Sequence, residues 1–327
     1  THCISSAASD VYKRQELLNS LTRQTNKNFE VLIVEDGSSV PCKEVVDNYA
    51  DRLDICYYFK SNSGPGQTRN YGAERGHGEY LIILDSDCIL PEGYLAAVES
   101  ELQRQKADAF GGPDCAHDSF TNIQKSINYA MTSFFTTGGI RGGKKKMDKF
   151  YPRSFNMGVR AEVYKALGGF SKMRFGEDID FSIRIFQGGY ACRLFPEAWV
   201  WHKRRTDLKK FFKQVHNSGI ARINLYKKYP ESLKVVHLLP ALFTIGIVFL
   251  LLCSLVCSWS LSLLLLFALI ICVDSTLRNK SFKIGLLSIL ASFIQLIGYG
   301  TGFLRAWWKR CVLGKNEFAA FEKNFYK

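Results

Sequence analysis

The sequence predicts an α/β domain with a mostly parallel central sheet, followed by C-terminal transmembrane helices. Three observations support this fold class. Apolar segments of strand length alternate with helix-like segments between residues 12 and 85, the order expected when helices connect parallel strands. Acidic residues follow two of the predicted strands, where sheets of this kind bind ligands. The last third of the chain contains two long runs without Asp, Glu, Lys or Arg.

The elements of the α/β part follow in order. Leu17, Leu18 and Leu21 recur at helical spacing and predict a helix over 12–25. The next elements are a strand over 29–39, a helix over 44–53, a strand over 54–61, a Gly/Pro turn leading into a helix over 64–76, and a strand over 79–85.

The centre of the chain is less regular. Residues 119–137 carry aromatic and Met side chains on one face of a predicted helix, which favours packing against a core or a membrane surface. Residues 138–154 are rich in Gly and Lys and predict a mobile loop.

The uncharged runs are Val235–Val273 and Ile284–Leu304. A helix rises about 1.5 Å per residue and the hydrocarbon core is about 30 Å thick, so roughly 20 residues make one crossing. The first run fits two crossings joined by a tight turn near Trp259, and the second fits one. We therefore expect transmembrane helices over about 235–255, 257–273 and 284–304.

The charge balance favours the cytoplasmic face of a membrane. The chain has 43 basic and 30 acidic residues, a net charge of +13. Lys203–Lys234 is strongly basic and directly precedes the first uncharged run, as is typical of a flank near anionic lipid. No segment resembles a nucleic-acid-binding module, so we expect no nucleic-acid partner. The ten cysteines contain no CxxC pair, which favours reduced thiols in a cytosol-facing protein.

The C-terminal tail leaves two alternatives open. Three crossings from a cytoplasmic start would place the tail outside, yet it carries Arg305, Lys309, Arg310 and Lys315. Either the run 284–304, with its three glycines, is re-entrant or interfacial, or the positive-inside rule fails at this point.

Two aspartates interrupt the apolar segment LIILDSDCIL. Side chains two residues apart on a strand share a face, so Asp85 and Asp87 can converge at the end of the strand. Two buried carboxylates repel each other unless a cation lies between them, and a hard divalent ion such as Mg²⁺ or Mn²⁺ prefers oxygen ligands. The alternative is an exposed pair in a turn.

A series of motifs places this pair in context. In order they are VEDGSS (34–39), GPGQTRNYG (64–72), LDSD (84–87), SFNMGVRAEVYKALGGF (154–170) and FGEDIDFSIRIFQGGYACRLFPEAWVWH (175–202). The series resembles the family 2 glycosyltransferases over roughly residues 15–205. The resemblance implies a GT-A-like, nucleotide-diphospho-sugar-binding fold.

The resemblance also implies roles for individual residues. By this resemblance, the residues that bind the nucleotide-sugar are Asp36, Glu35 beside it, Gly64, Arg69, Asn70 and Asp85. Asp87 would hold the metal, and His202 would reach the metal or the diphosphate. In FGEDIDF, Asp178 would be the catalytic base, with Glu177 adjacent; the alternative is an acidic helix N-terminus that the helix dipole favours.

The implied function is inverting, metal-dependent transfer of a sugar from a nucleotide-diphosphate donor, expected to be a UDP-sugar. The acceptor would be a hydroxyl of a lipid-linked or membrane-proximal glycan in cell-surface polysaccharide synthesis. The enzyme would lie in the bacterial inner membrane as a multi-pass protein in contact with membrane lipids, its catalytic domain cytoplasmic. The alternatives are transfer to polyprenyl phosphate and a catalytically inactive membrane scaffold.

The start of the chain departs from the family pattern. Family members begin with an apolar strand, whereas this sequence begins THCISSAASDVYKRQ. We therefore expect the first strand to be missing, the start to be truncated and the activity to be weak. The predicted organisation is a catalytic domain over 1–205 with an atypical start over 1–14, basic interfacial helices over 206–234, a transmembrane region over 235–304 and a basic tail over 305–327.

Overall fold

The computed structural model describes residues 2–7, 11–117, 119–138, 150–173 and 175–317. The chain divides into two compact units, which are described separately. The first, called the α/β unit, is built from Thr1–Cys115 and Lys144–His202. The second, called the helical unit, comprises Ala116–Gly143 and Lys203–Phe318.

The described residues of the α/β unit form a seven-stranded sheet in the order β3-β2-β1-β4-β8-β6-β9. Strands β1, β2, β3 and β4 pair in parallel, whereas β8 runs antiparallel to both β4 and β6. The sheet is therefore mixed, although mostly parallel as predicted. The strands are β1 (His2–Ala7), β2 (Glu30–Asp36), β3 (Ile55–Lys60), β4 (Tyr80–Asp85), β6 (Ala109–Gly111), β8 (Asn156–Arg160) and β9 (Cys192–Leu194).

The prediction that the first strand is missing is wrong. His2–Ala7 form β1, which lies between β2 and β4 and pairs with both in parallel. A strand between two others is held by backbone hydrogen bonds on both edges, and these bonds do not require the apolar side chains that the prediction looked for.

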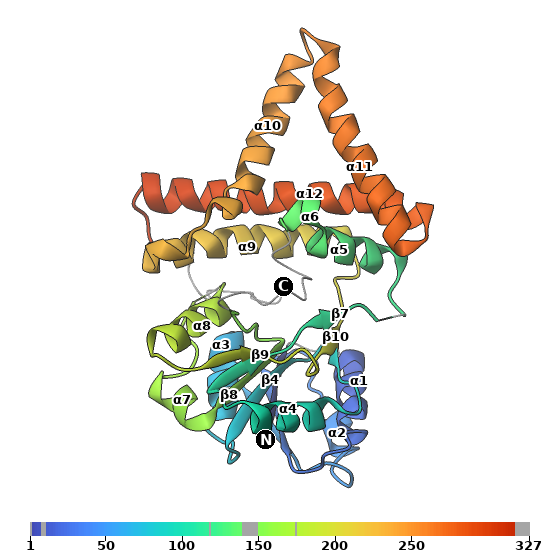
Figure 1. Cartoon of the computed structure of the whole chain (residues 1–327). Coiled ribbons are helices and arrows are strands. Elements are labelled where there is room, and N and C mark those ends of the chain that lie inside the picture. Colours follow the sequence, from blue (N-terminus) through green and yellow to red (C-terminus); the bar gives the residue numbers. More distant parts are fainter. Residues whose placement is uncertain (1, 8–10, 118, 139–149, 174, 318–327) are drawn as a thin grey trace. The chain divides into compact units, whose positions relative to one another are not determined.

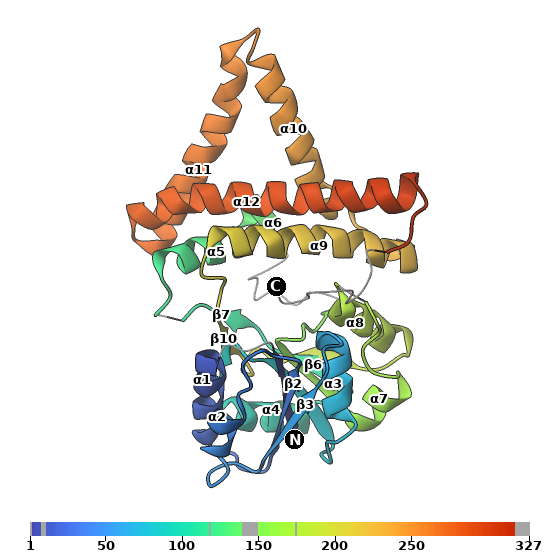
Figure 2. The same ribbon diagram turned by 180° about the vertical axis from the view of Figure 1, so that it is seen from behind.

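Helices cover both faces of this sheet. Leu32 of β2 and Ile83 of β4 belong to one buried cluster, and their neighbours Ile33 and Ile82 belong to the other. Burying each such side chain contributes about 1.5–3 kcal/mol, which explains why the strand sequences are continuously apolar. The helices are α1 (Val11–Thr22), α2 (Lys43–Asp47), α3 (Pro65–Ala73), α4 (Tyr94–Arg104), α7 (Ala161–Ala166) and α8 (Glu177–Gln187) (Figures 1 and 2).

A small second sheet joins segments that are far apart in the sequence. Its strands are β5 (Cys88–Ile89), β10 (Val200–His202) and β7 (Asp114–Cys115), with β10 in the middle. Gly112, just before β7, passes close to Ala198: a Cβ at this glycine would lie 1.7 Å from the Ala198 carbonyl oxygen. Glycine at this position therefore allows the two segments to approach.

The helical unit contains six α-helices in its described residues: α5 (Asn122–Thr132), α6 (Phe134–Thr137), α9 (Leu208–Lys228), α10 (Leu239–Cys253), α11 (Ser262–Asn279) and α12 (Phe282–Trp307). Helix α12 lies alongside α9, and α10 and α11 form a hairpin that extends away from α12 (Figures 1 and 2). Thr121 and Gln124 cap α5 through a reciprocal capping box, and Asp207 caps α9.

The observed helices refine the predicted ones. The helix expected over 44–53 ends at Asp47, and the helix expected over 119–137 is interrupted at Ser133, whose hydroxyl caps α6. Of the loop expected over 138–154, residues 139–149 lie outside the described residues. By length and composition, Ser258–Asn279 and Phe282–Val312 could each cross a membrane, whereas Leu239–Cys253 is shorter.

Candidate active site

The two aspartates of LDSD contact different groups. Asp85 is the last residue of β4, and Asp87 lies in the turn that leads to β5. Asp85 Oδ1 accepts a hydrogen bond from Arg69 Nη2 at 3.0 Å, whereas Asp87 Oδ1 lies 3.1 Å from His202 Nε2. The aspartates therefore belong to two clusters, which we call the arginine cluster and the histidine cluster.

The arginine cluster comprises Arg69, Asp85 and Glu177. Arg69 projects from α3 and is buried, with 5% of its side chain exposed. Its Nη1 donates to Glu177 Oε1 at 3.0 Å, so one guanidinium bridges two carboxylates. Burial opposes the charge on Arg69, but Asp85 and Glu177 outweigh it and raise the pKa of the guanidinium above its usual value. The bridge fixes the end of β4 against the start of α8.

Asp178 follows Glu177 in the first turn of α8, but its partner is different. Its Oδ2 accepts a hydrogen bond from Arg153 Nε at 2.6 Å. Burial would raise the pKa of Asp178, but the Arg153 charge outweighs burial and holds that pKa below its usual value. Burial and the neighbouring Asp178 raise the pKa of Glu177. The pKa values of these two adjacent carboxyl groups are therefore shifted in opposite directions, and the ionised form is favoured more strongly at Asp178.

The histidine cluster is built on the small sheet. His202 ends β10, Asp114 begins β7, and Asp87 directly precedes β5. His202 Nδ1 lies 3.7 Å from Asp114 Oδ2, and the imidazole stacks on the Phe155 ring with centroids 4.7 Å apart. The strand pairing thus places one imidazole between two carboxylates.

This donor set fits a divalent cation. Asp87 offers a carboxylate oxygen and His202 offers Nε2, 3.1 Å away, a combination that suits Mn²⁺ and related ions. Asp114 lies on the opposite, Nδ1 side of the ring, where a carboxylate can hold the imidazole in place. Cys88 lies close to the same atoms. However, burial, with Asp87 adding to it, raises the pKa of the Cys88 thiol well above its usual value, and its Sγ lies 3.4 Å from the Phe155 carbonyl oxygen. Without an ion, Cys88 is therefore a buried, protonated thiol beside Asp87 and His202.

Arg153 connects the two clusters electrostatically. The charge of Asp178 raises the pKa of Arg153 most, and the carboxylates of Glu177 and Asp114 raise it further. One guanidinium thus lies within reach of acids from both clusters. Its side chain is 38% exposed, so solvent also reaches this point.

The two acids at the end of β2 lie on opposite sides of the strand. Asp36 is fully buried and accepts hydrogen bonds from the backbone N–H groups of Ser63 and Gly64, each at 2.8 Å, and from Lys60 Nζ at 2.6 Å. Glu35 instead accepts hydrogen bonds from the Tyr57 hydroxyl and the Cys42 backbone N–H. The structure does not bring Glu35 to the Asp36 side of β2.

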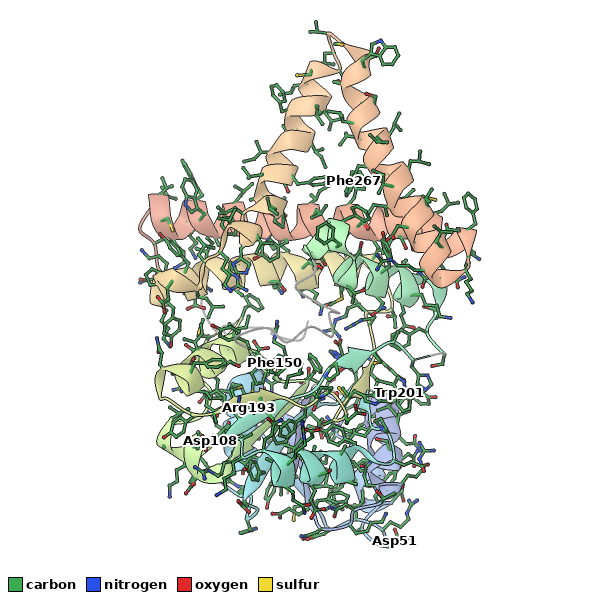
Figure 3. All side chains as sticks on the ribbon, viewed as in Figure 1. Asp51, Asp108, Phe150, Arg193, Trp201 and Phe267 are labelled. Atoms are coloured by element: carbon green, nitrogen blue, oxygen red, sulfur yellow. The ribbon has the colours of Figure 1, made fainter. Side chains whose placement is uncertain are left out.

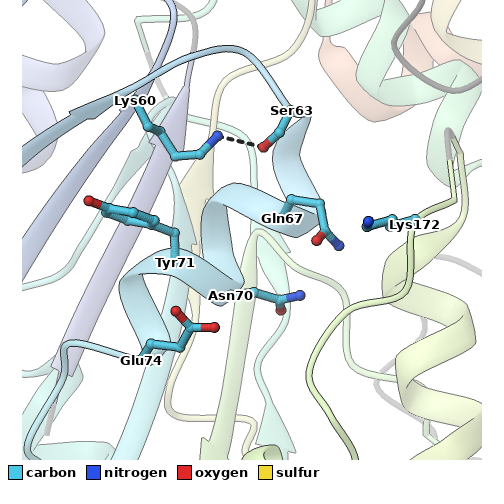
Figure 4. Close-up of a pocket in the computed structure, with 7 residues that line it drawn as sticks. All are labelled: Lys60, Ser63, Gln67, Asn70, Tyr71, Glu74 and Lys172. Atoms are coloured by element: carbon cyan, nitrogen blue, oxygen red, sulfur yellow. Dashed lines mark hydrogen bonds between the residues drawn. The ribbon is translucent and has the colours of Figure 1, made fainter.

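Gly64 and Asn70 have roles in local structure. Gly64 caps α3 with a φ of 88°, a left-handed conformation that favours glycine. The Asn70 amide accepts from the Phe170 N–H at 2.8 Å and donates to the Phe170 carbonyl at 2.9 Å, which ties α3 to the loop before α8. Asn70 also lines a pocket of about 520 Å³ beside α3 (Figure 4), together with Lys60, Ser63, Gln67, Tyr71, Glu74 and Lys172.

Sequence reasoning missed Asp114, Arg153 and Phe155. Asp114 gave a usable signal, because it follows the apolar strand β6 through a Gly-Gly-Pro turn, much as Asp85 ends β4. Arg153 and Phe155 gave none, because their partners are distant in the sequence and nothing in FYPRSFN indicates them.

Comparison with known proteins identifies the family. Residues 15–168 match the model described as glycosyl transferase family 2. The chain contains a family 2 glycosyltransferase domain. This match confirms the family expected from the motif series. The matched range includes Arg69, Asp85, Asp87 and Asp114, whereas Glu177 and His202 lie beyond it.

Several bacterial and archaeal proteins share the glycosyltransferase domain. An uncharacterized glycosyltransferase of Rickettsia felis is 32% identical over 127 residues, which cover 38% of this chain and 20% of that protein. The glycosyltransferase AglE of Haloferax volcanii is 26% identical over 246 residues, which cover 68% of this chain and 75% of AglE. The match to the first rickettsial relatives thus spans only about a fifth of their length.

Among solved structures, the glycosyltransferase domain and the rest of the chain resemble a mannosyltransferase from Pyrobaculum calidifontis, solved with GDP-Man and Mn²⁺. The TM-score is 0.63 at 16% identity, and the likeness covers 90% of this chain and 86% of the other. At this identity the likeness establishes the fold. It confirms the GT-A-like α/β architecture.

Proposed function

We propose that this glycosyltransferase transfers a sugar, with inversion, from a nucleotide-diphosphate donor to a hydroxyl of a lipid-linked or membrane-proximal glycan. One observation carries the proposal: acids from two separate motifs, LDSD and FGEDIDF, lie around Arg69, Arg153 and His202 within one unit. Such convergence at the ends of β4, β7 and β10 is what a shared donor and acceptor site requires.

The histidine cluster is proposed to hold a divalent ion, Mn²⁺ or Mg²⁺, through Asp87 and His202 Nε2, with Asp114 positioning the imidazole from its Nδ1 side. When bound, the ion would supply positive charge to the diphosphate as the nucleotide leaves. The imidazole favours Mn²⁺, because Mg²⁺ prefers an all-oxygen shell. The relative crystallised with Mn²⁺ supports this choice.

Asp178 is proposed as the base. In an inverting transfer, the acceptor hydroxyl loses its proton as its oxygen attacks the anomeric carbon from the face opposite the leaving group. Asp178 is the acid whose ionised form Arg153 stabilises, and Glu177 is engaged by Arg69. Asp178 therefore accepts the proton, and Glu177 and Asp85 position Arg69 near the donor.

The donor is proposed to be a UDP-sugar, and GDP-sugars are the second set to test because the mannosyltransferase relative was solved with GDP-Man. Asp36 and Gly64 would border the nucleotide through the loop that Asp36 holds at the end of β2. The enzyme is proposed to act at the cytoplasmic face of the bacterial inner membrane, in cell-surface polysaccharide synthesis.

The test measures nucleotide release from a panel of UDP- and GDP-sugars by the full chain in lipid vesicles, with Mn²⁺ and with EDTA. Turnover that needs the ion and is lost in Asp178→Asn supports the proposal. Asp51→Asn, an exposed aspartate on the same unit (Figure 3), is the matched control and should keep full activity.

Two outcomes would contradict the proposal. If Asp178→Asn spares transfer to polyprenyl phosphate, the acceptor is an ionised phosphate oxygen that needs no base. If no donor is turned over by a folded, vesicle-bound chain, the protein is a scaffold.

A further inference from the structure

Helix α12 packs against α9 with almost no space between the two backbones. A Cβ added at Gly302 would lie 2.0 Å from the His216 carbonyl oxygen, and one added at Gly298 would lie 2.5 Å from a methyl group of Val215. On α9, a Cβ at Gly219 would lie 2.2 Å from the Tyr299 carbonyl oxygen. The glycines therefore allow α12 to pack closely against α9. The two helices lie side by side in both views (Figures 1 and 2).

Helix α9 cannot cross the hydrocarbon of a bilayer. It has 21 residues, and Lys213 and Arg222 lie within about two turns of its centre. A charged side chain at the centre of a membrane-spanning helix costs about 2.5–3.5 kcal/mol on insertion scales. Further exposed lysines lie near both ends: Lys209, Lys210, Lys227 and Lys228. Lysine-rich helices with an apolar face lie in the interface. Because α12 packs along the length of α9, α12 must lie in the same interfacial plane as α9.

The opposite face of α12 contacts the hairpin. Gly300 is two residues from both Gly298 and Gly302, which places it on the other side of the helix. A Cβ at Gly300 would lie 2.4 Å from the Pro240 carbonyl oxygen of α10. Phe267 of α11 (Figure 3) packs against Phe293 of α12, with ring centroids 5.7 Å apart. Helix α12 is thus enclosed between α9 and the base of the hairpin.

The hairpin itself presents apolar side chains to its surroundings. No charged residue occurs between Val235 and Val273. At its tip, Leu255, Val256 and Trp259 are 83%, 94% and 82% exposed. So large a set of exposed apolar side chains needs a hydrocarbon environment, because water would penalise each of them. Further exposed members are Leu242, Val248, Phe249, Leu252, Leu263, Leu265 and Leu266.

The segment after α12 returns to α9. Arg310 Nη1 donates to the Asn224 amide oxygen at 2.6 Å, and the Asn224 amide nitrogen donates to Glu317 Oε1 at 3.0 Å. Asn224 is itself buried, with 3% exposed, so these bonds are shielded from water. They hold residues 310–317 beside α9.

We infer that α10 and α11 are the part of the helical unit that enters the bilayer, and that α9 and α12 lie flat on an anionic lipid surface. The chain after α12 then stays on the same side of the membrane as α9. Of the two alternatives that the sequence left open, this selects an interfacial helix over residues 284–304, and the basic tail obeys the positive-inside rule. The inference rests on the proposed function only in placing the chain at a membrane.

The experiment measures depth by spin labels at Leu286, Leu290 and Trp307, all partly exposed on α12, in the full chain bound to phosphatidylethanolamine–phosphatidylglycerol vesicles. Each residue is changed to cysteine after the exposed native cysteines are replaced by serine. Accessibility to oxygen and to a water-soluble nickel complex should give nearly the same shallow depth at all three positions. A label introduced by Val248→Cys, an exposed position near the middle of α10, should be deep.

A crossing α12 would give a different result. Residues 286 and 307 would differ in depth by about 30 Å at 1.5 Å per residue, and a steady gradient between them would overturn the inference. A second arm labels Lys210→Cys and Lys315→Cys with a membrane-impermeant maleimide in inverted vesicles and in intact cells. The two introduced cysteines should react in the same one of these two preparations and not in the other. If one cysteine reacts in inverted vesicles and the other in intact cells, the inference is also overturned. Neither measurement needs turnover, so its failure is distinct from failure of the proposed activity.

Discussion

Replacing Arg153 by Gln should raise the pH at which the enzyme gains activity. Arg153 Nε lies 2.6 Å from Asp178 Oδ2 and holds the pKa of this carboxyl below its usual value. Removing the positive charge lets that pKa rise, so the proposed base stays protonated to higher pH. The acidic limb of the profile of kcat/KM against pH should therefore move upward.

The size of the shift follows from the geometry. An opposite charge at this distance lowers a carboxyl pKa by about 1–3 units. The Asp178 side chain is 10% exposed, but Arg153 is 38% exposed and solvent screens its charge, which moderates the effect. On the acidic limb we expect Arg153→Gln to lose about tenfold in kcat/KM, equivalent to about 1.4 kcal/mol.

The assay follows nucleotide release from about pH 3 to about pH 7, a range that extends to both sides of the ordinary carboxyl pKa of about 4. Arg153→Lys keeps the positive charge and should leave most of the acidic limb of the pH profile in place. The matched control is Arg52→Gln, which removes an exposed arginine that is paired with Asp51. An acidic limb that stays unchanged in Arg153→Gln, in an enzyme whose Asp178→Asn variant is inactive, would refute the reasoning.

Three further predictions concern other contacts. Arg69→Gln leaves the buried Glu177 and the partly exposed Asp85 without their shared cation, and it should lower the free energy of unfolding by about 3 kcal/mol in urea titrations. Replacement of the more exposed Arg75 by Gln should lower it by less than about 1 kcal/mol, and equal effects would contradict the bridge. Asp114→Asn should raise the Mn²⁺ concentration for half-maximal activity on the order of tenfold, because His202 loses the carboxylate at its Nδ1. An unchanged requirement would show that Asp114 does not position His202 for the ion. In Gly302→Ala the added methyl group must separate two touching backbones, so the free energy of unfolding should fall by about 1–3 kcal/mol in thermal unfolding. In the control Gly246→Ala, on α10, the added methyl group meets open space. Similar melting temperatures for the two variants would contradict the packing of α12 against α9.

The sequence predicted several strands and helix starts of the α/β unit correctly, because the signals for these elements are local. Apolar runs located β2 and β4, and Gly64-Pro65 located the start of α3. It failed on β1, since a strand between two others depends on backbone pairing that a hydrophobic pattern does not reveal. The mixed direction of the sheet was also missed, because nothing in Asn156–Arg160 indicates that this strand runs antiparallel.

The candidate site was predicted as a set of acids but not as a pattern of contacts. Proximity in sequence suggested that Asp85 and Asp87 act together, yet their partners come from α3 and β10. Arg153 lies 25 residues from Asp178, and such a pairing is set by the fold of the whole unit. Residue type therefore indicates what chemistry is possible, whereas the partner of each acid has to be read from the structure.

The small sheet has a consequence for how the protein is made. Its strands come from the segments around residues 88, 114 and 200, so the proposed cation ligands meet only when the last of these has left the ribosome. An incomplete nascent chain cannot assemble this ion-binding centre, and binding stabilises only the finished fold. Capture of the ion would then follow the synthesis of β10, the last strand of the α/β unit.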